Sequence, residues 1–308
     1  MRQACLDMVY EMAKADERIL FIGSDLGVGT LDKFKQEMPR RFFMEGISEA
    51  NIIGVAAGLA LEGKVPYVNT IATFITRRCF EQIVVDLCLH NANVRLIGNG
   101  GGLVYAPLGA THEAIEDIAI MRALPNMTIV APADADEMRR LMPKTIDHDG
   151  PIYIRLAKGY DPIVTNDDVP FEIGKAIPMR DGDDALIITT GITLGVALDA
   201  AQTLSGQGIE ASILHCHTVK PLDSEAIMEM LQRVPVVVTV EEHIAIGGLG
   251  SAVAEIVAEA NFDTAKRFKR IGLPDLFPDE YGSQASLMEK YSITPDNVAS
   301  VVASLASR

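Results

Sequence analysis

Glu49 is the residue of this sequence whose type and place most strongly indicate chemistry: it opens a run of small and apolar residues that extends to Ala60. A helix of that composition is buried over most of its surface, so a carboxyl group in its first turn lies in a sheltered environment. A buried carboxylate is costly without a partner, although the partial positive charge of a helix N-terminus favours it. Two interpretations stay open, a cap that Glu49 forms with Ser48 and a proton-transfer group in a site.

Other candidate side chains follow predicted strands. Phe74 lies in the segment after one strand, where an aromatic ring is usually core but can also serve as a stacking platform. A long glycine-containing loop at residues 98–113 follows the next strand, and so long a loop is rarely idle. His112, near its end, is either a hydrogen-bonded structural residue or an acid–base candidate. Arg155, at the end of a later strand, can clamp a phosphate or carboxylate group or form a surface salt bridge.

These groups must be positioned by the elements that precede them, and apolar runs alternate with helical patterns along the chain. Strands are expected at residues 19–23, 41–43, 65–69, 94–97, 128–131 and 152–155, then at 185–190, 209–214, 236–240 and 268–271. Helices are expected at residues 3–15, 49–62, 77–90, 113–124 and 134–148, then at 192–204, 224–232 and 250–260. Continuously apolar strands joined by helices predict parallel sheets covered on both faces. Ligands bind beyond the carboxyl ends of such strands, so the loops that follow them are expected to form the site.

The length of the chain indicates two domains, because 308 residues exceed what one hydrophobic core usually serves. The alternating pattern is interrupted between residues 160 and 184, where Gly, Pro and Asp gather. We therefore expect an α/β fold with two parallel-sheet domains, residues 1–172 and residues 173–308.

Composition excludes several classes of function. The formal charge of −15, with no cluster of Lys and Arg to relieve it, argues against a nucleic-acid or anionic-membrane surface. No apolar run is long enough to span a bilayer and no signal region is evident, so a cytoplasmic protein without a membrane contact is expected. The four cysteines show no CxxC spacing and are expected to be reduced core thiols.

Three further signals carry little chemistry. His215 and His217 share one face of a predicted strand, but no second ligand pair is evident nearby and a zinc site is not expected. Residues 181–184 lack the rest of a calcium loop and are better interpreted as a linker. Residues 241–250 join a strand to a helix through a glycine turn, which can face a partner chain or make a close helix–sheet contact. No metal ligand is assigned to this chain.

Taken in order, these segments resemble the transketolase family. Likeness to its pyrimidine-binding domain rests on the run from Glu49 and on residues 65–67, 70, 74, 109–112, 124–127 and 131–134. Likeness to its C-terminal domain rests on residues 219–223 and 247–253. The resemblance covers essentially the whole chain and is closest to the C-terminal subunit of split bacterial transketolases. Deoxyxylulose-phosphate synthase and the β subunit of pyruvate dehydrogenase-type enzymes are similar more distantly.

The resemblance implies that the cofactor is thiamine diphosphate and gives four residues a place beside it. Glu49 would hydrogen-bond a nitrogen of the pyrimidine ring and so promote loss of the proton from C2 of the thiazolium ring. This role would make Glu49 a catalytic residue. A sheltered carboxyl group suits that exchange better than a well-hydrated one. Phe74 would stack on the pyrimidine, Asp25 would lie near the thiazolium ring, and Arg78 belongs to the same cofactor-binding segment as Phe74.

The resemblance also implies substrate contacts. His112 would contact the substrate and take part in catalysis, and Arg155 matches an arginine that holds the substrate phosphate. Split transketolases usually carry a histidine where Gly100 stands and an acidic pair where Pro107 and Leu108 stand. An ordinary pentose-phosphate substrate is therefore not expected. The glycines at 100–102 are expected to make room for a bulkier or less polar group, which Tyr105 would contact.

The family's diphosphate and Mg²⁺ site, a Gly-Asp-Gly segment followed by an Asn in a separate domain, has no counterpart in this sequence. The resemblance therefore implies a partner, an N-terminal transketolase subunit that carries these ligands, in an α2β2 heterotetramer. The expected activity is transfer of a two-carbon ketol unit from a ketose donor to an aldose acceptor. Two alternatives stay open: a subunit that decarboxylates a 2-oxo acid, as in pyruvate dehydrogenase or deoxyxylulose-phosphate synthase, and a scaffold without activity.

Overall fold

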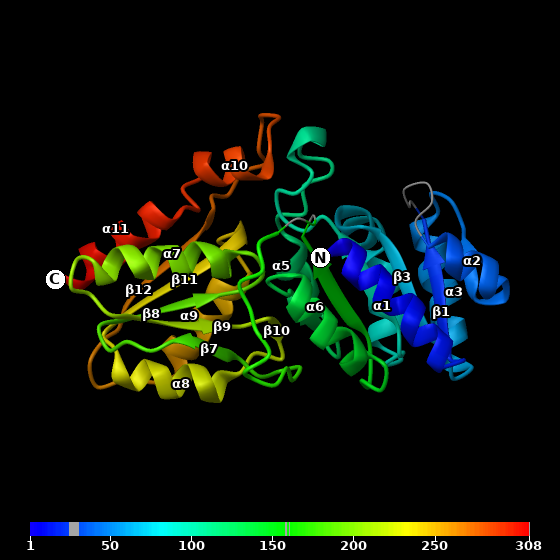
Figure 1. The fold of residues 1–308 in the computed structure, drawn as a ribbon, viewed down its shortest axis with the longest axis horizontal. Helices are drawn as coiled ribbons and strands as arrows, with labels where there is room; N and C mark the ends of the chain where they lie inside the picture. Colours follow the sequence, from blue (N-terminus) through cyan, green and yellow to red (C-terminus); the bar gives the residue numbers. More distant parts are fainter. Residues whose placement is uncertain (25–30, 158, 160, 308) are drawn as a thin grey trace.

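The computed structural model describes residues 1–24, 31–157, 159 and 161–307, and it contains two sheets that lie side by side (Figure 1). The first sheet has the strand order β10-β5-β6-β4-β3-β1-β2. Its strands are β1 (Ile19–Gly23), β2 (Phe42–Met44), β3 (Val65–Ile71), β4 (Arg95–Asn99), β5 (Thr128–Val130), β6 (Ile152–Leu156) and β10 (Thr218–Lys220). All pairings are parallel except that of β10 with β5.

The second sheet has the order β12-β11-β8-β9-β7. Its strands are β7 (Ile177–Arg180), β8 (Ala185–Thr189), β9 (Ala211–His215), β11 (Val236–Ile244) and β12 (Arg267–Leu273). Its pairings are parallel except that of β7 with β9. The predicted α/β fold of two largely parallel sheets is therefore confirmed, with β7 and β10 as antiparallel edge strands that the sequence pattern did not reveal.

Helices cover both faces of each sheet. In the first unit they are α1 (Arg2–Ala15), α2 (Asp32–Glu37), α3 (Glu49–Leu61), α4 (Phe80–Gln82), α5 (Asp117–Arg122) and α6 (Ala135–Leu141), and α4 lies between the π-helical turns η2 (Phe74–Arg78) and η3 (Ile83–Cys88). In the second unit they are α7 (Thr193–Ser205), α8 (Ser224–Arg233), α9 (Leu249–Glu259), α10 (Gln284–Lys290) and α11 (Pro295–Ala306). Among the residues described, no helix is long and apolar enough to cross a membrane.

The apolar core of the first sheet divides between its two faces. Side chains of α1 and α6 pack on one face, and side chains of α3 and of residues 75–88 pack on the other. The second of these clusters continues into the other unit, where it includes Leu186, Leu214 and Val237. The two sheets thus share part of one core, and β10 reaches from the second unit's sequence into the first unit's sheet (Figure 1).

The cysteines take no part in cross-links. Cys5, Cys79, Cys88 and Cys216 are free and buried. Burial raises the pKa of the Cys5 and Cys79 thiols to about 12 and that of Cys88 to about 11. These thiols are protonated at neutral pH, which confirms the expected core thiols.

Candidate functional site

Glu49 lies at the first position of α3, and its side chain is 1% exposed. One carboxylate oxygen accepts a hydrogen bond from the Ser24 hydroxyl at 2.9 Å, and the other accepts one from the Arg78 guanidinium at 2.6 Å. Ser48 is the N-cap residue but makes no side-chain cap bond, since its hydroxyl donates to the Glu45 carbonyl. The capping pair that the sequence left open is therefore not formed, and Glu49 is held by groups from β1 and η2.

These partners decide the charge of Glu49. Burial by itself raises the pKa of the carboxyl group, but the hydrogen bonds from Arg78, the backbone and Ser24, together with the Arg78 charge, outweigh it. The pKa therefore lies below its ordinary value, and Glu49 is a carboxylate at neutral pH. Such a group can accept a hydrogen bond and a proton from a ligand beside it.

A line of rings leads away from this carboxylate. The Arg78 guanidinium lies 4.4 Å from the centre of the Phe74 ring, and the Phe74 and His112 rings meet edge to face with 5.1 Å between centres. Beyond His112, the Tyr105 ring stands edge-on at 6.5 Å. The structure thus brings together Glu49, Phe74, Arg78 and His112, and beside them it places Tyr105, which the sequence suggested only as a contact of the substrate's end group. Asp25 lies outside the described residues.

The backbone that carries Phe74 and Arg78 has an unusual form. Residues 74–78 form a π-helical turn directly after β3, and such turns occur often at functional sites. The wider turn presents Phe74 and Arg78 on one side, so that the cation covers the ring and reaches Glu49. The predicted helix at residues 77–90 is therefore an alternation of π and α turns.

His112 does not begin a helix, contrary to the predicted helix at residues 113–124. It lies in a turn in which its N–H donates to the Gly109 carbonyl, and one ring nitrogen lies 2.9 Å from the Thr111 hydroxyl. Helix α5 begins only at Asp117, because Ala114 is drawn into isolated β-bridges with Gly101 and Gly102. The helix dipole therefore does not act directly on His112.

Arg155 is placed apart from this group. It is buried, its Nε donates to Asp117 at 2.8 Å, and one terminal nitrogen donates to the carbonyls of Glu242 and Ala114. The side chain thus joins the two units, and although burial by itself would lower its pKa, the Asp117 charge leaves that pKa above the ordinary value. A role in holding a substrate phosphate stays a prediction, and the geometry favours a structural one.

The glycines at 100–102 leave no open space, which corrects the expectation of room for a bulkier group. A Cβ atom built on Gly100 would lie 2.1 Å from the Tyr105 ring, on Gly101 2.5 Å from Arg155, and on Gly102 2.4 Å from Glu242. Each glycine is therefore covered by a large side chain. Gly100 itself is buried, and the ring of Tyr105 covers it.

Polar groups without partners mark the ends of β3 and β4. Among the described residues, the buried atoms Nδ2 of Asn69, Oγ1 of Thr70, Oγ1 of Thr73 and Oδ1 of Asn99 have no hydrogen-bond partner. Buried polar atoms are normally paired, so four such atoms close in sequence to Phe74 and Gly100 indicate a place for water or a polar ligand. A carboxylate, a stackable ring and unpaired polar groups together fit an aromatic, nitrogen-containing ligand.

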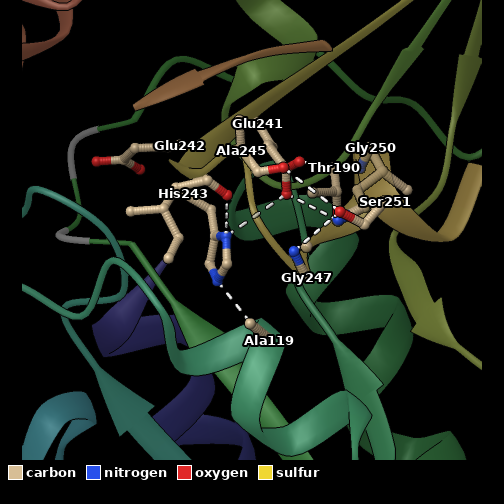
Figure 2. Close-up of polar contacts among 12 residues, drawn as sticks. Ala119, Thr190, Glu241, Glu242, His243, Ala245, Gly247, Gly250 and Ser251 are labelled. Atoms are coloured by element: carbon tan, nitrogen blue, oxygen red, sulfur yellow. Dashed lines mark hydrogen bonds and ion pairs between the residues drawn. The ribbon is translucent and has the colours of Figure 1, made fainter. Parts of the chain in front are cut away.

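The glycine turn after β11 forms a separate buried cluster (Figure 2). The Glu241 carboxylate accepts hydrogen bonds from the N–H groups of Leu249 and Gly250 at the start of α9. Nε2 of His243 accepts a hydrogen bond from the Ala119 N–H of α5, and its Nδ1 lies 2.6 Å from the Ile244 carbonyl. A Cβ on Gly248 would lie 2.0 Å from Glu241, so this segment makes the close helix–sheet contact.

Comparisons with known proteins agree with this arrangement. Residues 1–160 match the transketolase pyrimidine binding domain, and residues 174–298 match the transketolase C-terminal domain. Two α/β units in this order, with a glutamate at the start of α3, define a transketolase-type protein. The chain belongs to the transketolase family.

Within that family the chain is homologous to C-terminal subunits of split transketolases. The 6-deoxy-6-sulfo-D-fructose transketolase subunit of Clostridium sp. (strain MSTE9) is 38% identical over 97% of this chain and 92% of its own. One of the apulose-4-phosphate transketolase subunits, from Phocaeicola vulgatus, is 38% identical over 89% of this chain and 87% of its own. A split-gene transketolase, solved as an inactive β4 tetramer, superposes with a TM-score of 0.91 at 37% identity, over 99% of this chain and 98% of its own.

Other relatives contain the same two domains within longer chains. The 1-deoxy-D-xylulose-5-phosphate synthase of Desulforudis audaxviator is 37% identical over 94% of this chain but only 45% of its own. Transketolase from Pichia stipitis shares the fold at a TM-score of 0.77 and 19% identity, over 99% of this chain and 45% of its own. This chain therefore corresponds to about half of these proteins, and ketol transfer is the reaction of the family to which it belongs.

Proposed function

We propose that this chain supplies the pyrimidine half of a thiamine diphosphate site, and that an N-terminal transketolase subunit supplies the diphosphate and Mg²⁺ half. The proposal is supported most directly by the Glu49 carboxylate, which is buried, ionised and held by Ser24 and Arg78 beside the Phe74 ring. The absence of a Gly-Asp-Gly segment followed by Asn from the sequence is consistent with a second chain. When bound, the cofactor supplies the carbon nucleophile that accepts the ketol unit.

In this proposal the residues of the chain bind the cofactor's pyrimidine ring and promote loss of the proton from C2 of its thiazolium ring. Glu49 accepts a hydrogen bond from the pyrimidine ring, and Phe74 stacks on that ring. Arg78 keeps Glu49 ionised. His112, in contact with Phe74, faces the substrate. Asp25 keeps its proposed place near the thiazolium ring.

The proposed substrate class is supported by the names of two relatives and by the sequence of the loop. Relatives of this chain are named for a sulfonated ketose and for apulose 4-phosphate, so the sugar varies among close homologues. We propose a ketose donor and an aldose acceptor in which the donor's end group is not the terminal phosphate of an ordinary pentose phosphate. The assembly is an α2β2 heterotetramer with two copies of this chain at its centre, in the cytoplasm.

Reconstitution with the N-terminal subunit tests the proposal. The complex should bind thiamine diphosphate in a Mg²⁺-dependent way, exchange the cofactor's C2 proton with solvent deuterium, and turn over at least one ketose in a donor screen. Turnover of pyruvate with release of CO₂ would instead place it with the decarboxylating relatives. A complex that forms but does not bind the cofactor would identify a scaffold.

A further inference from the structure

Tyr105 completes a wall of rings that begins at the cofactor half-site. Its ring stands edge-on to His112, which in turn meets Phe74 edge to face. Phe74 is covered by Arg78, the partner of Glu49. Tyr105 and Glu49 are therefore the two ends of one line of contacts, which runs through His112, Phe74 and Arg78.

The place of this ring is fixed by Gly100. Gly100 has a φ of +73°, which glycine adopts readily and other residues rarely do. The ring of Tyr105 approaches so closely that a Cβ at position 100 would lie 2.1 Å from its Cε2 and 2.4 Å from its Cδ2. Tyr105 is half-buried and also packs on the core formed with α1, so its ring cannot tilt far from the site.

The arginine side chains near these rings are already paired with carboxylates. Arg77 pairs with Glu116 and Arg78 with Glu49. A phosphate dianion buried in such a place needs several donors to offset its loss of hydration. An aromatic face instead packs well against the C–H groups of a sugar.

We propose that Tyr105 determines the donor specificity of the site, by presenting its ring to the distal end of the ketose and disfavouring a terminal phosphate there. The inference rests on the proposed transketolase function. It assigns donor choice to Tyr105 and cofactor activation to Glu49, so we expect mutation to separate the two.

The test compares Tyr105→Ala, Tyr105→Leu and Tyr105→Phe in the reconstituted complex. The ratio of kcat/KM for D-xylulose 5-phosphate to that for D-xylulose is measured with one aldose acceptor. We expect the ratio to rise about tenfold in Tyr105→Ala, the size of effect that one pocket contact usually has on selectivity. Tyr105→Phe keeps the ring and should leave the ratio within about twofold. Tyr10→Ala, on α1 and bonded to Glu37, is the matched control outside the site.

C2 deuterium exchange of the bound cofactor is measured in parallel, without substrate. Normal exchange in every variant, with a changed donor ratio only in Tyr105→Ala and Tyr105→Leu, supports the inference. A ratio that changes less than about threefold in both would overturn it. If neither donor turns over, calorimetric affinities for the two sugars replace kcat/KM with the same thresholds. If the wild-type complex shows no C2 exchange, the result would count against the proposed function and not against the role inferred for Tyr105.

Discussion

The carboxylate of Glu49 depends on residues that are far away in sequence. Ser24 follows β1, Arg78 ends η2, and both donate to a side chain at the start of α3. Burial alone would favour the protonated acid, but the hydrogen bonds from these two donors help to keep the carboxyl group ionised. The charge thus depends on tertiary contacts as well as on the local backbone.

Glu49→Gln should fold normally in the reconstituted complex but lose activity by about 10²-fold or more, since the amide cannot exchange a proton. Turnover and C2 deuterium exchange measure the loss. Ser48→Ala, which removes only a hydroxyl bonded to the Glu45 carbonyl, is the control and should turn over normally. Near-normal exchange in Glu49→Gln would show that Glu49 has no part in proton transfer.

Arg78→Gln should make the stability of the protein depend differently on pH. The folded pKa of Glu49 lies below its ordinary value, so its contribution is present above the unfolded pKa and is lost as pH falls through the folded pKa. Without Arg78 that pKa rises, and the variant is less stable near pH 7, by at most about 1 kcal/mol because Arg78 is partly exposed.

This stability difference should shrink as pH falls toward 4, where the carboxyl group becomes protonated in the variant. Urea unfolding at several pH values measures it. Arg139→Gln, whose exposed side chain pairs with the exposed Asp136 on the same helix, is the control and should show almost no difference. A difference for Arg78→Gln that does not vary with pH would mean that the charge of Glu49 is not involved.

Two helices depend on strand β11 for their first turns. The N-terminal N–H groups of α9 donate to Glu241, and α5 of the other unit donates from Ala119 to His243 (Figure 2). N–H groups in the first turn of a helix have no partner within the helix, so these side chains complete both elements.

Glu241→Ala should therefore lower the free energy of unfolding by about 2 kcal/mol or more, because two buried N–H groups lose their acceptor. Thr294→Ala, which removes the ordinary cap of α11, should cost about 1 kcal/mol. Urea denaturation of both variants gives the comparison. Equal losses would show that water replaces the Glu241 carboxylate.

At the scale of elements, the sequence predicted those whose pattern is local. The parallel strands and most helices lie within a few residues of their expected bounds, because each is a continuous apolar or periodic run. β10 pairs with a strand about 90 residues earlier, and no local pattern marks it. The start of α11 did carry a signal, Thr294 before Pro295, that was not used.

The candidate site, like the elements, was predictable where its signal is local in the sequence. Glu49, Phe74 and His112 follow strands, where open α/β sheets bind ligands, and the structure brings them together with Arg78. The burial of Arg155 could not be foreseen, because its partners Asp117 and Glu242 lie on segments far away in sequence. Tyr105 was expected only as a contact of the substrate's end group, and its packing against Gly100 could not be foreseen because it depends on the backbone angle of that glycine.

In the molecule as a whole, the two units are joined by a shared core and by buried polar contacts. Glu137 of α6 and His215 of β9, both fully buried, lie 3.1 Å apart, and Arg155 links Asp117 to the carbonyl of Glu242. Family models end at residue 160 and resume at residue 174, and our proposed boundary near residue 172 falls between them.

Fragments 1–172 and 173–308, expressed separately, should therefore not fold cooperatively. The first lacks β10, and both expose apolar side chains and charges that are buried in the intact chain. Thermal melting followed by circular dichroism should show no sharp transition for either fragment but one for the two co-expressed. A sharp transition for residues 1–172 alone, near that of the intact chain, would contradict this.

The intact chain without its partner should bind thiamine diphosphate only weakly and should not turn over. It offers groups for the pyrimidine ring, and in the proposal the diphosphate and Mg²⁺ ligands lie on the other subunit. Calorimetry with and without the N-terminal subunit measures the difference. Mg²⁺-dependent binding by this chain alone with a micromolar Kd would contradict the division of the site.

The burial of the four cysteines has a practical consequence. Thiol-directed reagents react with the thiolate, and the raised pKa values of Cys5, Cys79 and Cys88 leave almost none at neutral pH. A single cysteine introduced at the exposed Leu108 would then take up a fluorophore without removal of any native thiol. Since the chain contains no tryptophan, it adds no indole emission to that of a tryptophan on the partner subunit. Energy transfer from that indole to the fluorophore at position 108 would then measure the rate at which the two subunits associate.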